Sequence, residues 1–151
     1  MYKISTNLSG CFSAEMYIVE IDDERSLIQV MRSSGLGAEI GKYEEVKVAD
    51  DHVEAFKSEI EAILGKPEKL RGDRTTNVYR VNIEFGGREI TVESSEVPQL
   101  QLEELTEDSS CSPSLRQKVL INKVDGYHNW SHELHRLTKK FVESALKGAA
   151  A

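Results

Sequence analysis

Three of the four histidines lie close together near the end of the chain, at His128, His132 and His135. On a helix that turns about 100° per residue, residues spaced i, i+4 and i+7 project within about 60° of one another. Imidazole both titrates near neutrality and commonly binds metals, so this cluster is the place where the sequence could carry out chemistry.

The surroundings of this cluster argue against a zinc enzyme. A zinc site needs three or four converging N, S or O ligands at about 2.0–2.3 Å. Asn129 or Ser131 would serve as a helix N-cap, and either choice leaves His128 outside the helix, where a shared face is not guaranteed. The order His-Glu-Leu-His also lacks the His-Glu-x-x-His spacing of catalytic zinc helices. We therefore expect ordinary, solvated histidines and no bound metal or cofactor, and we keep a metal site built on His128, His132 and His135 as the alternative.

The element that carries these histidines is predicted to be a helix from about Asn129 to Lys147. Its apolar residues recur at helical spacing and form one stripe. The stripe consists of Trp130, Leu134, Leu137, Phe141 and Ala145. Because the histidines project to the opposite side, we expect them to face solvent while the stripe packs on the core.

Strand patterns dominate the first third of the chain. The segment 2–8 is predicted to be an edge strand, and the runs 14–21 and 27–31 a hairpin. The run 14–21 is apolar on both sides of its alternation, which is typical of a central strand covered on both faces. The glycine-rich segment 33–42 is expected to be a connecting loop, because its spacing fits neither a phosphate-binding loop nor a dinucleotide fingerprint.

A helix and a second hairpin are predicted in the middle of the chain. Apolar residues at helical spacing predict a helix over 51–64, with Asp51 as N-cap and Glu54 completing a capping box. The segments 79–85 and 90–93 alternate about the two-residue turn Gly86-Gly87, which suits the positive φ angles of such turns. This register places the apolar residues of both strands on one buried face. They are Val81, Ile83, Ile90 and Val92.

The remaining segments give weaker signals. The region 94–124 is ambiguous between helix and strand, and 106–113 is an acidic, serine-rich loop. Cys11 and Cys111 lie far apart without a metal-binding spacing, so two reduced thiols are expected.

Composition limits the class of protein. The chain has 151 residues, of which 39% are hydrophobic and 30% charged, and its net charge is −7. This predicts one soluble α+β domain over 1–148, an antiparallel sheet of about five strands packed by two helices, with 149–151 as a cloning remnant. The charge opposes binding to nucleic acid and to anionic membranes. With no secretory signal visible, we expect a cytoplasmic protein.

These features favour a noncatalytic domain that captures a basic protein partner. Bacterial immunity proteins and inhibitors include many chains of similar size and charge, although fold does not imply function. The alternatives are a metal-dependent hydrolase using the histidine cluster and a small structural subunit or homodimer; the oligomeric state stays open. The acidic residues expected to bind the partner lie on the outer hairpin face and beside the acidic loop: Glu84, Glu89, Glu93, Glu103, Glu104, Glu107 and Asp108.

Overall fold

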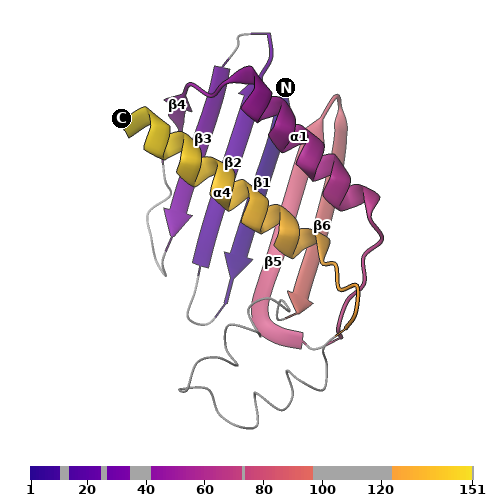
Figure 1. The fold of residues 1–151 in the computed structure, drawn as a ribbon. Helices are drawn as coiled ribbons and strands as arrows, with labels where there is room; N and C mark the ends of the chain where they lie inside the picture. Colours follow the sequence, from indigo (N-terminus) through magenta and orange to yellow (C-terminus); the bar gives the residue numbers. More distant parts are fainter. Residues whose placement is uncertain (11–13, 25–26, 35–41, 73, 97–123, 151) are drawn as a thin grey trace.

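The computed structural model describes residues 1–10, 14–24, 27–34, 42–72, 74–96 and 124–150. The elements in these residues are β1 (Tyr2–Ser9), β2 (Ala14–Asp22), β3 (Leu27–Ser34), β4 (Glu44–Val46), α1 (Asp50–Gly65), β5 (Arg74–Phe85), β6 (Arg88–Glu96) and α4 (Trp130–Ala150). The six strands form one antiparallel sheet in the order β4-β3-β2-β1-β5-β6, and both helices lie on one face of it (Figure 1). The predicted α+β class is confirmed, with one strand more than expected because the short β4 lies just beyond the glycine-rich segment. No helix of the described residues is long and apolar enough to cross a membrane.

The hairpin of β5 and β6 has the predicted register. Gly86 and Gly87 form its turn with φ angles of 52° and 78°, which a glycine backbone adopts at no steric cost. Ile83 pairs with Ile90, and Val81 pairs with Val92. Val81 and Ile83 are buried as predicted, whereas their partners are only half-buried because β6 is the last strand of the sheet.

The first strand is central, so its prediction as an edge strand is wrong. β1 pairs with β2 on one side and with β5 on the other. Alternation along β1 places Ile4, Thr6 and Leu8 on the buried face. The neighbouring β2 is also central, as expected, but only its helix-covered face is fully buried, since Met16 and Ile18 on the other face stay partly exposed.

Helix α1 contributes its predicted apolar stripe to the core. Val53, Phe56 and Ile60 are buried within it. The helix begins one residue earlier than predicted, with Ala49 at the N-cap position and no side-chain capping bond. Asp51 instead accepts a hydrogen bond from the backbone N–H of His52, so the predicted capping box is wrong.

Helix α4 packs on all six strands and beside α1. It begins directly after Asn129, whose Oδ1 accepts a hydrogen bond from the backbone N–H of His132 at 3.2 Å, so Asn129 is the N-cap. The helix continues to Ala150, beyond the predicted end. Phe141, from the predicted stripe, turns toward α1 and stacks on Phe56 with ring centroids 4.2 Å apart. The apolar stripe of α4 is therefore shared between the sheet and α1. The face of α4 that packs on the sheet includes the histidines.

Candidate functional site

The predicted acidic residues of the hairpin lie on the sheet face opposite α1 and α4. Glu84, Glu89 and Glu93 are all exposed there. Glu84 and Glu89 are direct cross-strand neighbours, and Glu89 accepts a hydrogen bond from Asn82 Nδ2 at 2.7 Å. Glu93 instead pairs with Arg80, with the Nε and Oε2 atoms 3.8 Å apart, so its charge is partly neutralised. The other four predicted residues, Glu103, Glu104, Glu107 and Asp108, lie outside the described part of the chain.

The strand order extends this acidic pair into a row that crosses the whole sheet. Cross-strand pairing links neighbouring residues from β4 to β6 in a single line. In order, the row consists of Glu45, Gln29, Glu20, Lys3, Glu84 and Glu89. We call this line the acidic row. It holds four carboxylates and one ammonium group, and Lys3 pairs with Glu20 at 3.5 Å.

Two carboxylates of the acidic row were missed in the sequence. Glu20 and Glu45 come from segments that have no local link to the hairpin, and only the strand order places them in line with it. Tyr43 lies beside the row, since its hydroxyl is hydrogen-bonded to Glu20, and its side chain is largely exposed. Partial burial and the Glu20 carboxylate raise the pKa of Tyr43. An exposed aromatic ring next to carboxylates offers both an apolar surface and a site for cations.

The histidine cluster is buried, so the prediction of solvated histidines is wrong. His132 and His135 lie on the first turns of α4 with only 8% and 4% of their surface exposed. Their rings make edge contacts with Tyr79 at centroid distances of 5.2 and 5.4 Å. His128 lies outside the helix, as predicted, with Nε2 2.8 Å from the carbonyl oxygen of Ile63. His128 is therefore apart from His132 and His135, whose rings share the contact with Tyr79.

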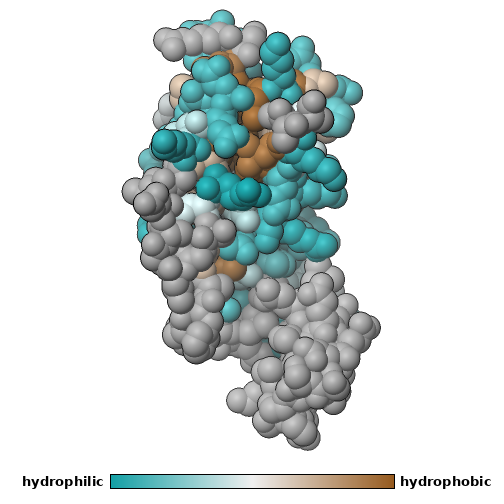
Figure 2. Space-filling model, turned by 90° about the vertical axis from the view of Figure 1, so that its left-hand side faces the viewer, coloured by the Kyte–Doolittle hydropathy of each residue, from teal (hydrophilic) through white to brown (hydrophobic). Residues whose placement is uncertain are grey.

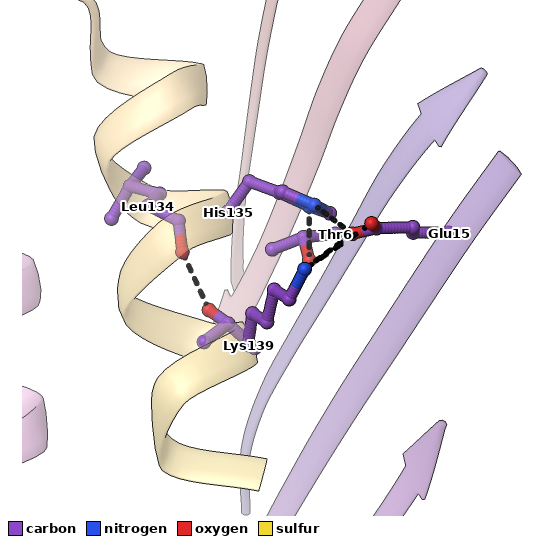
Figure 3. Close-up of polar contacts among 6 residues, drawn as sticks. Thr6, Glu15, Leu134, His135 and Lys139 are labelled. Atoms are coloured by element: carbon purple, nitrogen blue, oxygen red, sulfur yellow. Dashed lines mark hydrogen bonds and ion pairs between the residues drawn. The ribbon is translucent and has the colours of Figure 1, made fainter. Parts of the chain in front are cut away.

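His135 is held between two strands by its two ring nitrogens (Figure 3). Nε2 lies 3.2 Å from Glu15 Oε2, and Nδ1 lies 2.9 Å from Thr6 Oγ1. A carboxylate can only accept, so Nε2 carries the proton, and the neutral ring accepts from the Thr6 hydroxyl through Nδ1. Lys139, one turn further along α4, donates to the other oxygen of Glu15 at 3.2 Å. The network fastens α4 to β1 and β2.

Protonation states in this network follow from burial and from the Glu15 contacts. Burial, reinforced by the nearby charges of His135 and Arg136, lowers the pKa of His132 to about 4. Burial also lowers the pKa of His135, although the Glu15 carboxylate opposes the shift. Burial disfavours the charged form of Glu15, but hydrogen bonds from His135 and Lys139 outweigh it and lower the pKa of this carboxyl. Near neutral pH both imidazoles are therefore uncharged, and the prediction of ordinary titration is wrong for them.

The order hydroxyl, imidazole and carboxylate is also that of a hydrolytic triad, with Thr6 in the place of the nucleophile. Here Thr6 is fully buried, with 0% of its surface exposed, so a substrate carbonyl has no approach to its hydroxyl. Among the described residues, no three histidine, cysteine, aspartate or glutamate side chains converge as metal ligands. This arrangement fits a structural network that aligns the helix on the sheet.

The chain matches no protein-family model, and no curated protein is significantly similar to it. The fold and the geometry of its surfaces therefore carry the functional reasoning.

Proposed function

We propose that the chain is a noncatalytic protein-binding domain whose sheet face opposite α1 and α4 captures a basic protein partner. The acidic row is the observation that supports this proposal. Glu84 and Glu89 are like charges directly opposite each other, a pairing that destabilises a sheet. A row that costs stability and exposes its charges is suited to a partner that supplies the missing cations.

The physical advantage of such a surface is speed of association. Complementary charge steers a partner toward the surface and raises the association rate more than it deepens affinity. Tyr43 adds an exposed aromatic ring beside the row, and aromatic residues are enriched at protein interfaces. An inhibitor or immunity-type role in the cytoplasm, acting on a basic toxin or enzyme, is the finer form of this proposal.

A pull-down from the native host with wild-type protein and a charge-reversed variant tests the proposal. The variant Glu45→Lys/Glu89→Lys changes both ends of the acidic row, where the side chains are exposed. A control variant, Glu59→Lys/Glu61→Lys, makes the same change in net charge on exposed positions of α1. The captured partner should be basic. At low salt its association rate with the row variant, measured on the purified pair, should be about tenfold lower than with wild-type protein. Equal association rates for both variants would show that the acidic row is not the interface.

A further inference from the structure

A groove lies at the end of the sheet where the end of β2, the start of β3, β4 and the start of α1 meet. Its volume is about 670 Å³, within the range of roughly 300–1,000 Å³ typical of ligand-binding clefts. The apolar part of its lining consists of the half-buried Leu27 and Val48 and of four side chains buried in the core, Ile21, Ile28, Val46 and Val53. Figure 2, which shows the β4 side of the molecule, has apolar surface gathered in its upper half between hydrophilic side chains.

The rim of this groove is acidic. Four carboxylates line it: Asp22, Asp23, Asp50 and Glu54. Two ammonium groups lie near them. Lys47 lines the groove, and Lys57 Nζ lies 3.4 Å from Asp23 and 3.8 Å from Glu54. Among the described residues the rim therefore carries more carboxylates than ammonium groups around an apolar floor.

This combination selects the chemistry of its occupant. An apolar side chain that covers the apolar floor stabilises the complex by about 25 cal/mol for each Å² of apolar surface removed from water. The rim repels acidic residues and attracts basic ones. We propose that the groove binds a segment of a partner protein in which an apolar side chain is flanked by lysine or arginine. The groove is distinct from the acidic row, and this inference rests on the proposed function only for the positive charge of the partner.

The occupant can be tested without knowing the partner, by selecting from a displayed library of random linear peptides against the full chain. The selected peptides should share an apolar residue flanked by lysine or arginine. Their affinity should fall by about tenfold for Asp50→Asn/Glu54→Gln, which removes rim charge without changing side-chain shape. The control Glu59→Gln/Glu61→Gln removes the same charge from the same helix away from the groove and should leave the affinity unchanged.

A second pair of variants tests the apolar floor. Val48 is half-buried in the groove lining, and Val48→Trp should fill the cavity and abolish binding of the selected peptides. Leu70→Trp changes an exposed apolar residue outside the groove and should have no effect on binding. Circular dichroism and the melting temperature of each variant establish that it is folded before its affinity is compared.

The proposal is overturned if no peptide binds, or if the selected peptides lack an apolar residue flanked by lysine or arginine. It is also overturned if these peptides bind Val48→Trp with the same affinity as wild-type protein. Its failure is distinguishable from failure of the proposed function. Peptide binding to the groove should persist in Glu45→Lys/Glu89→Lys, because both substituted side chains lie on the opposite face of the sheet from the groove. Capture of the whole partner tests the acidic row, and peptide affinity tests the groove.

Discussion

The Nε2 atom of His135 lies 3.2 Å from a carboxylate oxygen of Glu15, and this hydrogen bond joins α4 to β2. The residues lie 120 positions apart in the sequence. The contact shows how this fold uses polar side chains inside a helix–sheet interface. The charge stays on the carboxylate, which also receives Lys139, while the imidazole stays neutral.

The neutral imidazoles predict that acid destabilises the protein. The pKa of His132 is about 4 in the folded state, below its usual value of 6.5, and that of His135 is also lowered. Between pH 6.5 and about 4 the unfolded chain binds more protons than the folded protein does. The contribution of His132 to the free energy of unfolding is therefore fully present above about pH 6.5 and is lost as the pH falls toward 4. For His132 alone the loss is about 3 kcal/mol. Urea unfolding at a series of pH values measures it. The lowered pKa of Glu15 extends the loss to still lower pH.

Replacing His132 with phenylalanine should remove much of this acid sensitivity. The Nδ1 atom of His132 is buried and has no hydrogen-bond partner, and such an atom costs about 1–3 kcal/mol. His132→Phe keeps an aromatic ring against Tyr79 and should raise the free energy of unfolding at pH 7 by about 1 kcal/mol. The same substitution at the exposed His52 is the control and should leave the pH profile unchanged. An unchanged profile in His132→Phe would assign the acid sensitivity to other groups.

The Glu15–His135 contact predicts different costs for two substitutions. Glu15→Leu leaves the Nε2–H group of His135 without its acceptor and should cost about 1–3 kcal/mol of unfolding free energy. Glu15→Gln keeps an acceptor and should cost less, under about 1 kcal/mol. Urea titrations at pH 7 compare the two variants. Equal costs would mean that the carboxylate charge, rather than the hydrogen bond, carries the contribution.

The N-cap of α4 predicts a large effect at Asn129. This side chain is fully buried, and its Nδ2 donates to Ser94 Oγ at 2.8 Å while Oδ1 caps the helix. Asn129→Ala should cost more than the 0.5–2 kcal/mol typical of a lost cap, roughly 3 kcal/mol, because the Ser94 bond is lost as well. Asn129→Ser keeps an oxygen acceptor at the cap and loses only the bonds that Nδ2 makes to Ser94 and Tyr127, so it should be milder. A melting temperature for Asn129→Ala close to wild type would contradict this role.

The acidic row predicts a substitution that stabilises the fold while weakening partner capture. Glu89→Gln keeps the acceptor for Asn82 and removes the like charge opposite Glu84. The free energy of unfolding should rise by a few tenths of a kcal/mol at low salt. High salt screens the pair, so the gain should disappear there. A gain that persists in high salt would point to packing rather than charge.

The sequence predicts locally paired elements well and the orientation of packed elements poorly. The hairpin about Gly86-Gly87 and the helix over 51–64 depend on neighbouring residues, and both are confirmed. The position of β1 depends on β5, which no local pattern links to it. The prediction of which face of α4 packs on the sheet was wrong. Thr138 and His135 are polar, yet both are buried against the sheet. Hydropathy counts them as exposed, whereas Thr138 donates to the Leu134 carbonyl at 2.7 Å and His135 bonds to Thr6 and Glu15.

The acidic row shows the same limit for the candidate site. Glu84 and Glu89 were predicted because a hairpin register follows from local alternation. Glu20 and Glu45 join them only through the strand order, and Tyr43 only through its contact with Glu20. The groove combines three segments in the same way. A surface built from separate strands becomes visible only once their order is known.

The central place of β1 also shapes how the chain is made. During synthesis β1 and β2 emerge before β5 and can pair at once, because they are neighbours in sequence. The other edge of β1 must wait for β5, whose residues 78–85 leave the ribosome much later. Until then a nascent chain carries an open strand edge in its centre, and such edges recruit other chains. Pairing of β5 with β1 then removes this open edge.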